Sequence, residues 1–171
     1  MPKKRQPGAL TLSEDDRRVL AVWAADCAER TLALFETKAP DDPRPREAIE
    51  GARSFARGEM RIGPMRALAV AAHEAARGVD DPAAVAAARA AGHAAAVAHM
   101  ASHARGVAYA AKAAGLAAPD DPDRVAKEAA WQVSHASPSV RAVLRRLPAP
   151  QSGGGELGAL IRNLHEKTTD G

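Results

Sequence analysis

The sequence has few of the residues that build β-sheets or disulfide-linked folds. Aromatic residues make up 3% of its 171 positions, and Cys27 is its single cysteine. One cysteine cannot form an intramolecular disulfide, so nothing favours an oxidising compartment. The shortage of aromatic and β-branched residues excludes a β-sandwich or a β-barrel. Alanine instead fills forty-three positions, which predicts an all-α fold with closely packed helices.

The sequence also lacks a strong excess of one charge. Lys and Arg number 24 against 21 Asp and Glu, giving a net charge of +3. A dedicated nucleic-acid-binding protein usually has a larger and more clustered excess. The balance therefore does not favour nucleic acid as the partner.

Long apolar runs are missing as well. The basic start, Met-Pro-Lys-Lys-Arg, precedes no apolar stretch, so it does not predict a secretory signal. The alanine-rich segment 83–118 carries Arg89, Arg105, Lys112 and three histidines, which argues against a membrane span. We expect a cytoplasmic protein with no membrane contact.

Capping residues predict the first helices. Ser13 is followed by three acidic residues that suit the N-terminal end of a helix dipole, which predicts a helix from Ser13 to about Thr37. Asp41 or Asp42 is expected to cap a second helix that ends near Gly58. Later boundaries follow from proline, glycine and aspartate. The further helices are expected from Pro64 to Gly78, from Asp121 through Val133, and from Ser137-Pro138 to Leu147.

Between Pro82 and Pro119, twenty of 36 residues are alanine and none is acidic. A single helix of ~34 residues would be ~50 Å long, which is too long for a domain of this size. We therefore expect a break near Ala101-Ser102 or at Gly106.

Three segments make up the expected organisation. Residues 1–10 form a basic tail, and residues 11–148 form one all-α domain. Residues 149–171 form a glycine-rich linker and a short amphipathic helix, with apolar residues at Leu157, Leu160, Ile161 and Leu164. This helix could dock on its own domain or on a partner.

The tripeptide Asp-Asp-Pro occurs at 41–43, 80–82 and 120–122. This spacing is compatible with helical-hairpin repeats of about 40 residues. Asp-Pro is also a common helix start, which gives the other interpretation, a compact bundle of about six helices.

The segment after Gly92 holds His93, His99 and His103. On a continuous helix, His99 and His103 would share one stripe and could bind a metal ion. The segment has no carboxylate to act as the base of a catalytic zinc site. The histidines could equally fill gaps between alanine-rich helices or form a polar face toward a partner. No phosphate loop, nucleophile elbow or paired-cysteine motif is present, so we predict neither catalytic residues nor a cofactor, and no enzyme.

Three segments in matching order carry a family resemblance: Trp23-Ala-Ala-Asp-Cys-Ala-Glu-Arg, Pro43-Arg-Pro-Arg-Glu-Ala-Ile-Glu, and the histidine segment from Ala88 to Ala110. The chain resembles the Imm-five-like group of immunity proteins from bacterial polymorphic toxin systems, over residues from about 12 to 115 and more weakly to 147. The resemblance implies an all-α, non-catalytic protein that binds and neutralises a cognate toxin. It assigns no binding residues.

The surface expected to contact the partner holds His93, His99, His103, Arg105 and Tyr109, because polar groups there interrupt an alanine surface. Inhibitors of nuclease toxins are often acidic, whereas this chain is mildly basic. Occlusion by shape and apolar contact, or a target other than a basic nuclease, fits this charge better.

Two other functions remain open at this point. One is a nucleic-acid-associated helical-repeat protein, to which Arg141, Arg145 and Arg146 give a weak hint. The other is a metal-binding helical bundle that uses His93, His99 and His103. The sequence does not determine the oligomeric state.

Overall fold

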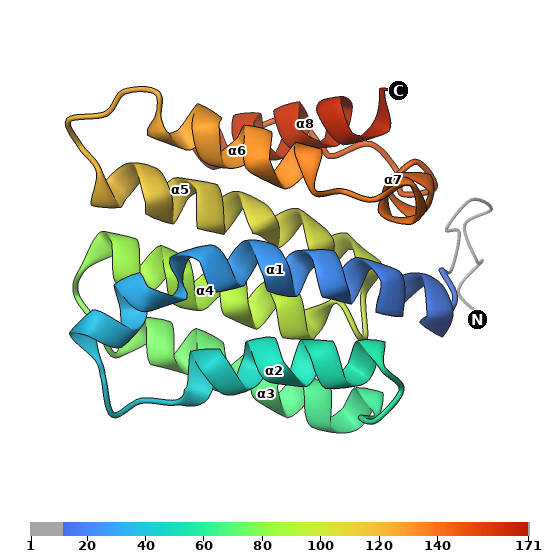
Figure 1. The fold of residues 1–171 in the computed structure, drawn as a ribbon, viewed down its shortest axis with the longest axis horizontal. Coiled ribbons are helices and arrows are strands. Elements are labelled where there is room, and N and C mark those ends of the chain that lie inside the picture. The colour runs from blue at the N-terminus through green and yellow to red at the C-terminus, as the bar shows by residue number, and fades with distance from the viewer. Residues whose placement is uncertain (1–11, 171) are drawn as a thin grey trace, which may run out of the picture.

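The computed structural model describes residues 12–170, and these form eight α-helices and one 3₁₀ helix without any strand (Figure 1). The bounds are α1 (Glu14–Lys38), α2 (Arg44–Ala56), α3 (Ile62–Arg77), α4 (Pro82–Ala96), the 3₁₀ helix η1 (Ala101–Gly106), α5 (Val107–Ala117), α6 (Arg124–Ser134), α7 (Pro138–Leu144) and α8 (Gly155–Thr169). The all-α prediction is confirmed. The basic tail expected at residues 1–10 lies outside the described residues. Within the described part of the chain, no helix combines the length and apolarity needed to cross a membrane.

Helix α4 occupies the centre of the bundle. It packs against α1, α2, α3 and α5, and eleven of its residues are buried, all of them alanine or glycine. Figure 1 shows α1 and α4 in the middle, with α2 and α3 on one side and α5, α6 and α8 on the other. Small side chains on the central helix let four neighbours approach it closely, so the core is held by many short contacts. The expected compact bundle is confirmed.

Three helices begin with a side-chain cap, and the one at Ser13 was predicted. The Ser13 hydroxyl accepts the backbone N–H of Asp16 at 3.1 Å, and the Asp16 carboxylate accepts the N–H of Ser13 in return. Asp81 accepts the N–H of Ala84 at the start of α4, and Ser137 caps α7. These caps satisfy backbone donors that would otherwise lack partners in the first turn.

The predicted caps at Asp42 and Asp121 are wrong. The residues at the caps of α2 and α6 are Pro43 and Asp123, and neither makes a side-chain cap bond. Asp42 and Asp121 lie just outside the helices, where each carboxylate accepts the N–H two residues ahead, at 3.2 and 3.1 Å. Asp side chains commonly close turns in this way.

Helix α3 begins at Ile62, two residues before the expected Pro64. A proline is tolerated there because the first-turn N–H groups have no partner within the helix.

The three Asp-Asp-Pro tripeptides each precede a helix, namely α2, α4 and α6. Helix α2 packs against α3, and α4 packs against α5, as hairpins would. Helix α7 packs mainly against α1 and α8, so the third tripeptide does not begin a comparable hairpin. Because α1 contacts α2, α4, α5 and α7, the helices surround a shared core and are not stacked as repeats.

The C-terminal amphipathic helix docks on its own chain. Helix α8 contacts α5, α6 and α7, and its Leu164 and Thr168 are buried. The sequence left this docking open.

Candidate functional site

The alanine-rich segment breaks earlier than expected, and the break changes how its histidines lie. Helix α4 ends at Ala96, and the chain turns through residues 97–100 into η1. Met100 is extended, with φ −152° and ψ 111°, so the helix cannot continue. The Ala98 carbonyl in this turn accepts the Arg17 side-chain Nε–H at 2.8 Å. The expected break is confirmed but lies before Ala101-Ser102, so His99 and His103 do not share the stripe of one continuous helix on which the metal hypothesis depended.

The histidines nevertheless meet in space. Nδ1 of His93 lies 3.1 Å from Nδ1 of His103, and the His99 ring centroid lies 5.3 Å from that of His103. Tyr109 of α5 stacks on His93 with centroids 5.1 Å apart and an interplanar angle of 12°. His73 of α3 meets the edge of His93 at 5.0 Å. We call His73, His93, His99 and His103 the histidine cluster.

Two glycines make room for these rings. A Cβ on Gly92 would lie 2.7 Å from the His73 ring, and a Cβ on Gly106 would lie 2.2 Å from Cβ of His93. Glycine costs a helix about 1 kcal/mol relative to alanine, so glycine in an alanine-rich segment is a signal of close approach. Gly92 is thus the sequence feature from which a close approach of another helix could have been predicted, although glycine alone does not identify His73.

The cluster is held neutral by its surroundings. Burial, together with the nearby His73, His103 and Arg89, lowers the pKa of His93 to about 3. Burial also lowers the pKa of His73 and His103, each with help from neighbouring positive charges. Desolvation penalises the charged imidazolium, and adjacent cations repel it. At neutral pH these rings act as uncharged polar groups.

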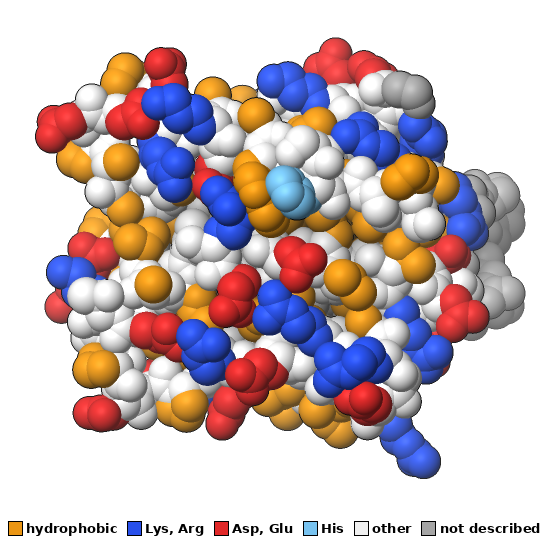
Figure 2. Space-filling model, viewed as in Figure 1, with side chains coloured by type: hydrophobic (Ala, Val, Ile, Leu, Met, Phe, Trp, Pro, Cys, Tyr) orange, Lys and Arg blue, Asp and Glu red, His pale blue; other side chains and the backbone are white. Residues whose placement is uncertain are grey.

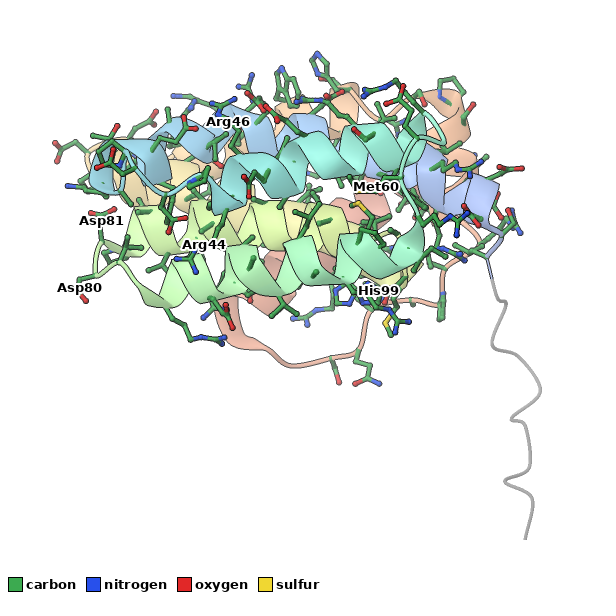
Figure 3. The ribbon with its side chains drawn as sticks, turned by 90° about the horizontal axis from the view of Figure 1, so that it is seen from below. Arg44, Arg46, Met60, Asp80, Asp81 and His99 are labelled. Atoms are coloured by element: carbon green, nitrogen blue, oxygen red, sulfur yellow. The ribbon has the colours of Figure 1, made fainter. Side chains whose placement is uncertain are left out.

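The cluster opens onto a surface hollow of about 470 Å³. Its lining comes from α3, the end of α4 and η1, and consists of Arg66, Ala69, Val70, His73, Ala96, His99 and His103. Val70 is 56% exposed, and Met100 beside His99 is 52% exposed. Figure 3 shows His99 beside α3, at the end of the bundle where Met60 lies and opposite the end that holds Asp80 and Asp81.

Arg105 is separated from the cluster. Its guanidinium donates to the Pro148 carbonyl, and the residue lines a small hollow beneath α8 with Trp23 and His165. Burial lowers the pKa of Arg105. Of the five residues predicted from the sequence, the structure therefore brings together His93, His99, His103 and Tyr109.

Neither alternative from the sequence finds a matching arrangement. No group of three or more His, Cys, Asp or Glu side chains within residues 12–170 is placed to hold a metal ion. Arg141 donates to the carbonyls of Val133, Ala136 and Lys167, at the ends of α6 and α8.

The other two arginines of that patch are engaged as well. Arg145 donates to the Thr169 carbonyl, and Arg146 pairs with Asp16 at 2.9 Å. These side chains join helices together, in contrast to the open row of cations that a phosphate backbone requires.

A family model with the description "Imm-5 like putative immunity protein" matches residues 10–139. The matched part runs from α1 into the start of α7 and includes the whole histidine cluster. No curated protein and no solved structure matches the chain.

Proposed function

The chain belongs to the family of Imm-5 like immunity proteins, and from this membership we propose that it binds a cognate toxin and neutralises it without catalysing a reaction. The match over residues 10–139 of 171 is the observation that carries the proposal. It spans the central helix, its neighbours and the histidine cluster, so the shared part is the folded bundle itself.

The toxin-contacting surface is assigned to the hollow beside α3. His99 and His103 line it together with the exposed, apolar Val70, and the exposed Met100 directly follows His99 in the chain. An apolar centre with polar groups around it is the usual composition of a specific protein interface. His93 and Tyr109 stack behind the lining and hold it in place.

Capture of the partner tests this function. The tagged full chain is incubated with nuclease-treated lysate of the source organism at low and at high salt. We expect one stoichiometric protein that stays bound at high salt. Expressed alone, that protein should arrest bacterial growth, and co-expression of this chain should restore it. A captured protein that is harmless, or a toxin whose effect persists despite binding, contradicts the proposal.

Binding that disappears with nuclease treatment or falls steeply with salt would identify nucleic acid as the partner. The surface assignment has its own test. His99→Ala with His103→Ala should weaken toxin binding, whereas Lys112→Ala, on the exposed part of α5, should not. Unchanged affinity in the histidine variant would show that the toxin binds elsewhere.

A further inference from the structure

Four residues form one stripe along α3. Arg66, Val70, His73 and Arg77 follow at spacings of four, three and four residues, which places them on the same side of a helix. At 1.5 Å per residue the stripe is about 16 Å long. Val70 and His73, in the middle of this stripe, line the hollow. Arg66 and Arg77 are the two ends of the stripe.

A fifth residue extends this stripe onto the central helix. Arg89 of α4 lies three residues before Gly92, where an added Cβ would be 2.7 Å from the His73 ring, and after burial its charge helps to lower the pKa of His73. Arg66 lowers the pKa of His99 in the same way. Arginines therefore stand on both sides of the histidine cluster. We call Arg66, Val70, His73, Arg77, Arg89 and His99 the arginine–histidine face.

Three arginines of this face have no anionic partner in the part of the chain that the structure describes. Among residues 12–170, Arg66, Arg77 and Arg89 form neither an ion pair nor a hydrogen bond. Glu74, the acidic residue of α3, raises the pKa of Arg44 in α2, so its charge acts toward another helix. The charged groups that shift the pKa of the four clustered histidines are arginines and other histidines, with no carboxylate among them.

We infer that the arginine–histidine face receives an acidic segment of the toxin, whose carboxylates pair with Arg66, Arg77 and Arg89 while an apolar side chain enters the hollow beside Val70. Guanidinium groups bind carboxylates through two parallel hydrogen bonds, which gives such a contact direction as well as charge complementarity. The inference rests on the proposed function for the identity of the partner, and on the unpaired arginines for its chemistry.

An acidic protein segment fits this face better than a nucleic acid does. Single-stranded nucleic acids are usually bound by aromatic rings that stack on the bases, and no Phe, Trp or Tyr lines the hollow. The apolar Val70 and Met100 would face a phosphate backbone without a matching contact. The half-buried, neutral rings of His73 and His103 add no positive charge at neutral pH.

The first test needs no toxin. The full-length ¹⁵N-labelled chain is titrated with a short poly-L-glutamate at low salt, and the amide shifts are followed by NMR. We expect the shifts to concentrate on α3 and residues 97–103 and to vanish as salt is added, because exposed charge pairs are screened. The double variant Arg66→Glu/Arg77→Glu should weaken binding by about tenfold or more. Lys112→Glu carries a charge reversal on α5 and should leave these shifts unchanged.

Two results in this titration would overturn the inference. One is the absence of shifts on the arginine–histidine face. The other is tighter binding at the same face by a single-stranded oligonucleotide of equal charge, which would assign the face to nucleic acid. Circular dichroism of the double variant checks that it folds, which is expected because Arg66 and Arg77 are exposed.

A second measurement separates this inference from the proposed function. If toxin is captured and neutralised but Arg66→Glu/Arg77→Glu binds it as tightly as wild type, the inference fails and the function stands. If poly-L-glutamate binds this face but the captured protein is harmless, the immunity function fails and the acidic-segment site stands. If the double variant loses both the binding of poly-L-glutamate and the binding of the toxin, the inference is supported.

Discussion

Two faces of the bundle both carry arginines but differ in whether those arginines are paired with carboxylates. On the face formed by α1 and α2, Arg53 contacts Asp26 at 3.0 Å and Glu29 at 3.2 Å, and Arg46 contacts Glu36 at 2.6 Å. Figure 2 shows acidic and basic side chains interleaved there. On the arginine–histidine face, the arginines have no carboxylate partner among the described residues.

This difference shows what net charge conceals. A total of +3 on 171 residues describes a nearly balanced protein. Within residues 12–170, the arginines of α2 are paired with carboxylates, whereas Arg66 and Arg77 of α3 and Arg89 of α4 form no ion pair. A field produced by one such face can direct the approach of an oppositely charged partner even when net charge is small.

The largest predicted effect concerns the histidine cluster at the arginine–histidine face. We expect the free energy of unfolding to fall in acid because of these histidines. The folded-state pKa of His93 is lowered to about 3 from an ordinary 6.5, so the folded protein binds fewer protons than the unfolded chain between these values. The stabilisation that comes from keeping His93 neutral is complete above pH 6.5 and is lost as the pH falls toward 3. Linkage gives a loss of about 3 kcal/mol between pH 7 and pH 4 from this residue.

Urea unfolding followed by circular dichroism at several pH values measures this loss. The variant His93→Gln should show a flatter dependence over the same range, because its side chain does not titrate. The ion-paired carboxylates Asp16 and Asp42 have lowered pKa values, so their contribution falls below about pH 4, outside this window. Equal slopes for the variant and the wild type would show that His93 does not carry the effect.

A smaller effect is expected from filling the space that Gly106 leaves for His93. In Gly106→Ala the new Cβ would lie 2.2 Å from Cβ of His93, an atom fixed by the backbone of α4. Overpacking of this kind costs about 2 kcal/mol, after the gain in helix propensity is subtracted. Thermal and urea unfolding measure the change.

Gly63→Ala is the matched control for this substitution. Nothing lies within 4 Å of a Cβ at Gly63, so stability should be unchanged or slightly higher. A Gly106→Ala variant as stable as this control would mean that α4 and η1 separate easily, and the cluster would not be a rigid unit.

The smallest predicted effect is the difference in stability change between removing a paired arginine and removing an unpaired one. Arg53→Gln removes contacts to Asp26 and Glu29, and exposed pairs of this kind contribute about 0.5 kcal/mol. Arg66→Gln removes a cation with no partner among the described residues, so stability should stay the same or rise slightly. Unfolding at low and high salt checks both, because only the Arg53 contribution should shrink with salt. A larger loss from Arg66→Gln than from Arg53→Gln would contradict the assignment of the two faces.

Local signals in the sequence predicted much of the fold. The predicted cap at Ser13 is confirmed, because a hydroxyl before a helix can accept a first-turn N–H. Asp81 and Ser137 cap α4 and α7 in the same way, at helix starts that the prolines after them had indicated. Asp42 and Asp121 have the same chemistry, and like Asp81 each is followed by a proline, but their carboxylates close turns outside the helices instead. Such competition between turn and cap depends on backbone angles that composition does not specify.

The candidate site was predictable only in part. His93, His99 and His103 stand out because they interrupt a run of alanine. His73 was missed because it lies on another helix, twenty positions before His93, and no pattern of spacing joins the two. Arg105 was included because it is close in sequence, yet the turn at residues 97–100 and the 3₁₀ geometry of η1 direct it toward Pro148 and α8.

The sequence by itself determined that this protein is helical, where most helices begin and end, and that its central segment must break. Those properties depend on contacts within a few residues, which the order of alanine, glycine, proline and capping side chains defines. Only the tertiary structure decided that four histidines share one cluster and that α8 docks on its own chain. It also decided that, within residues 12–170, the arginines of α3 and α4 lack carboxylate partners while those of α2 are paired. Those properties depend on which helix faces lie side by side, and that follows from packing the whole chain around α4.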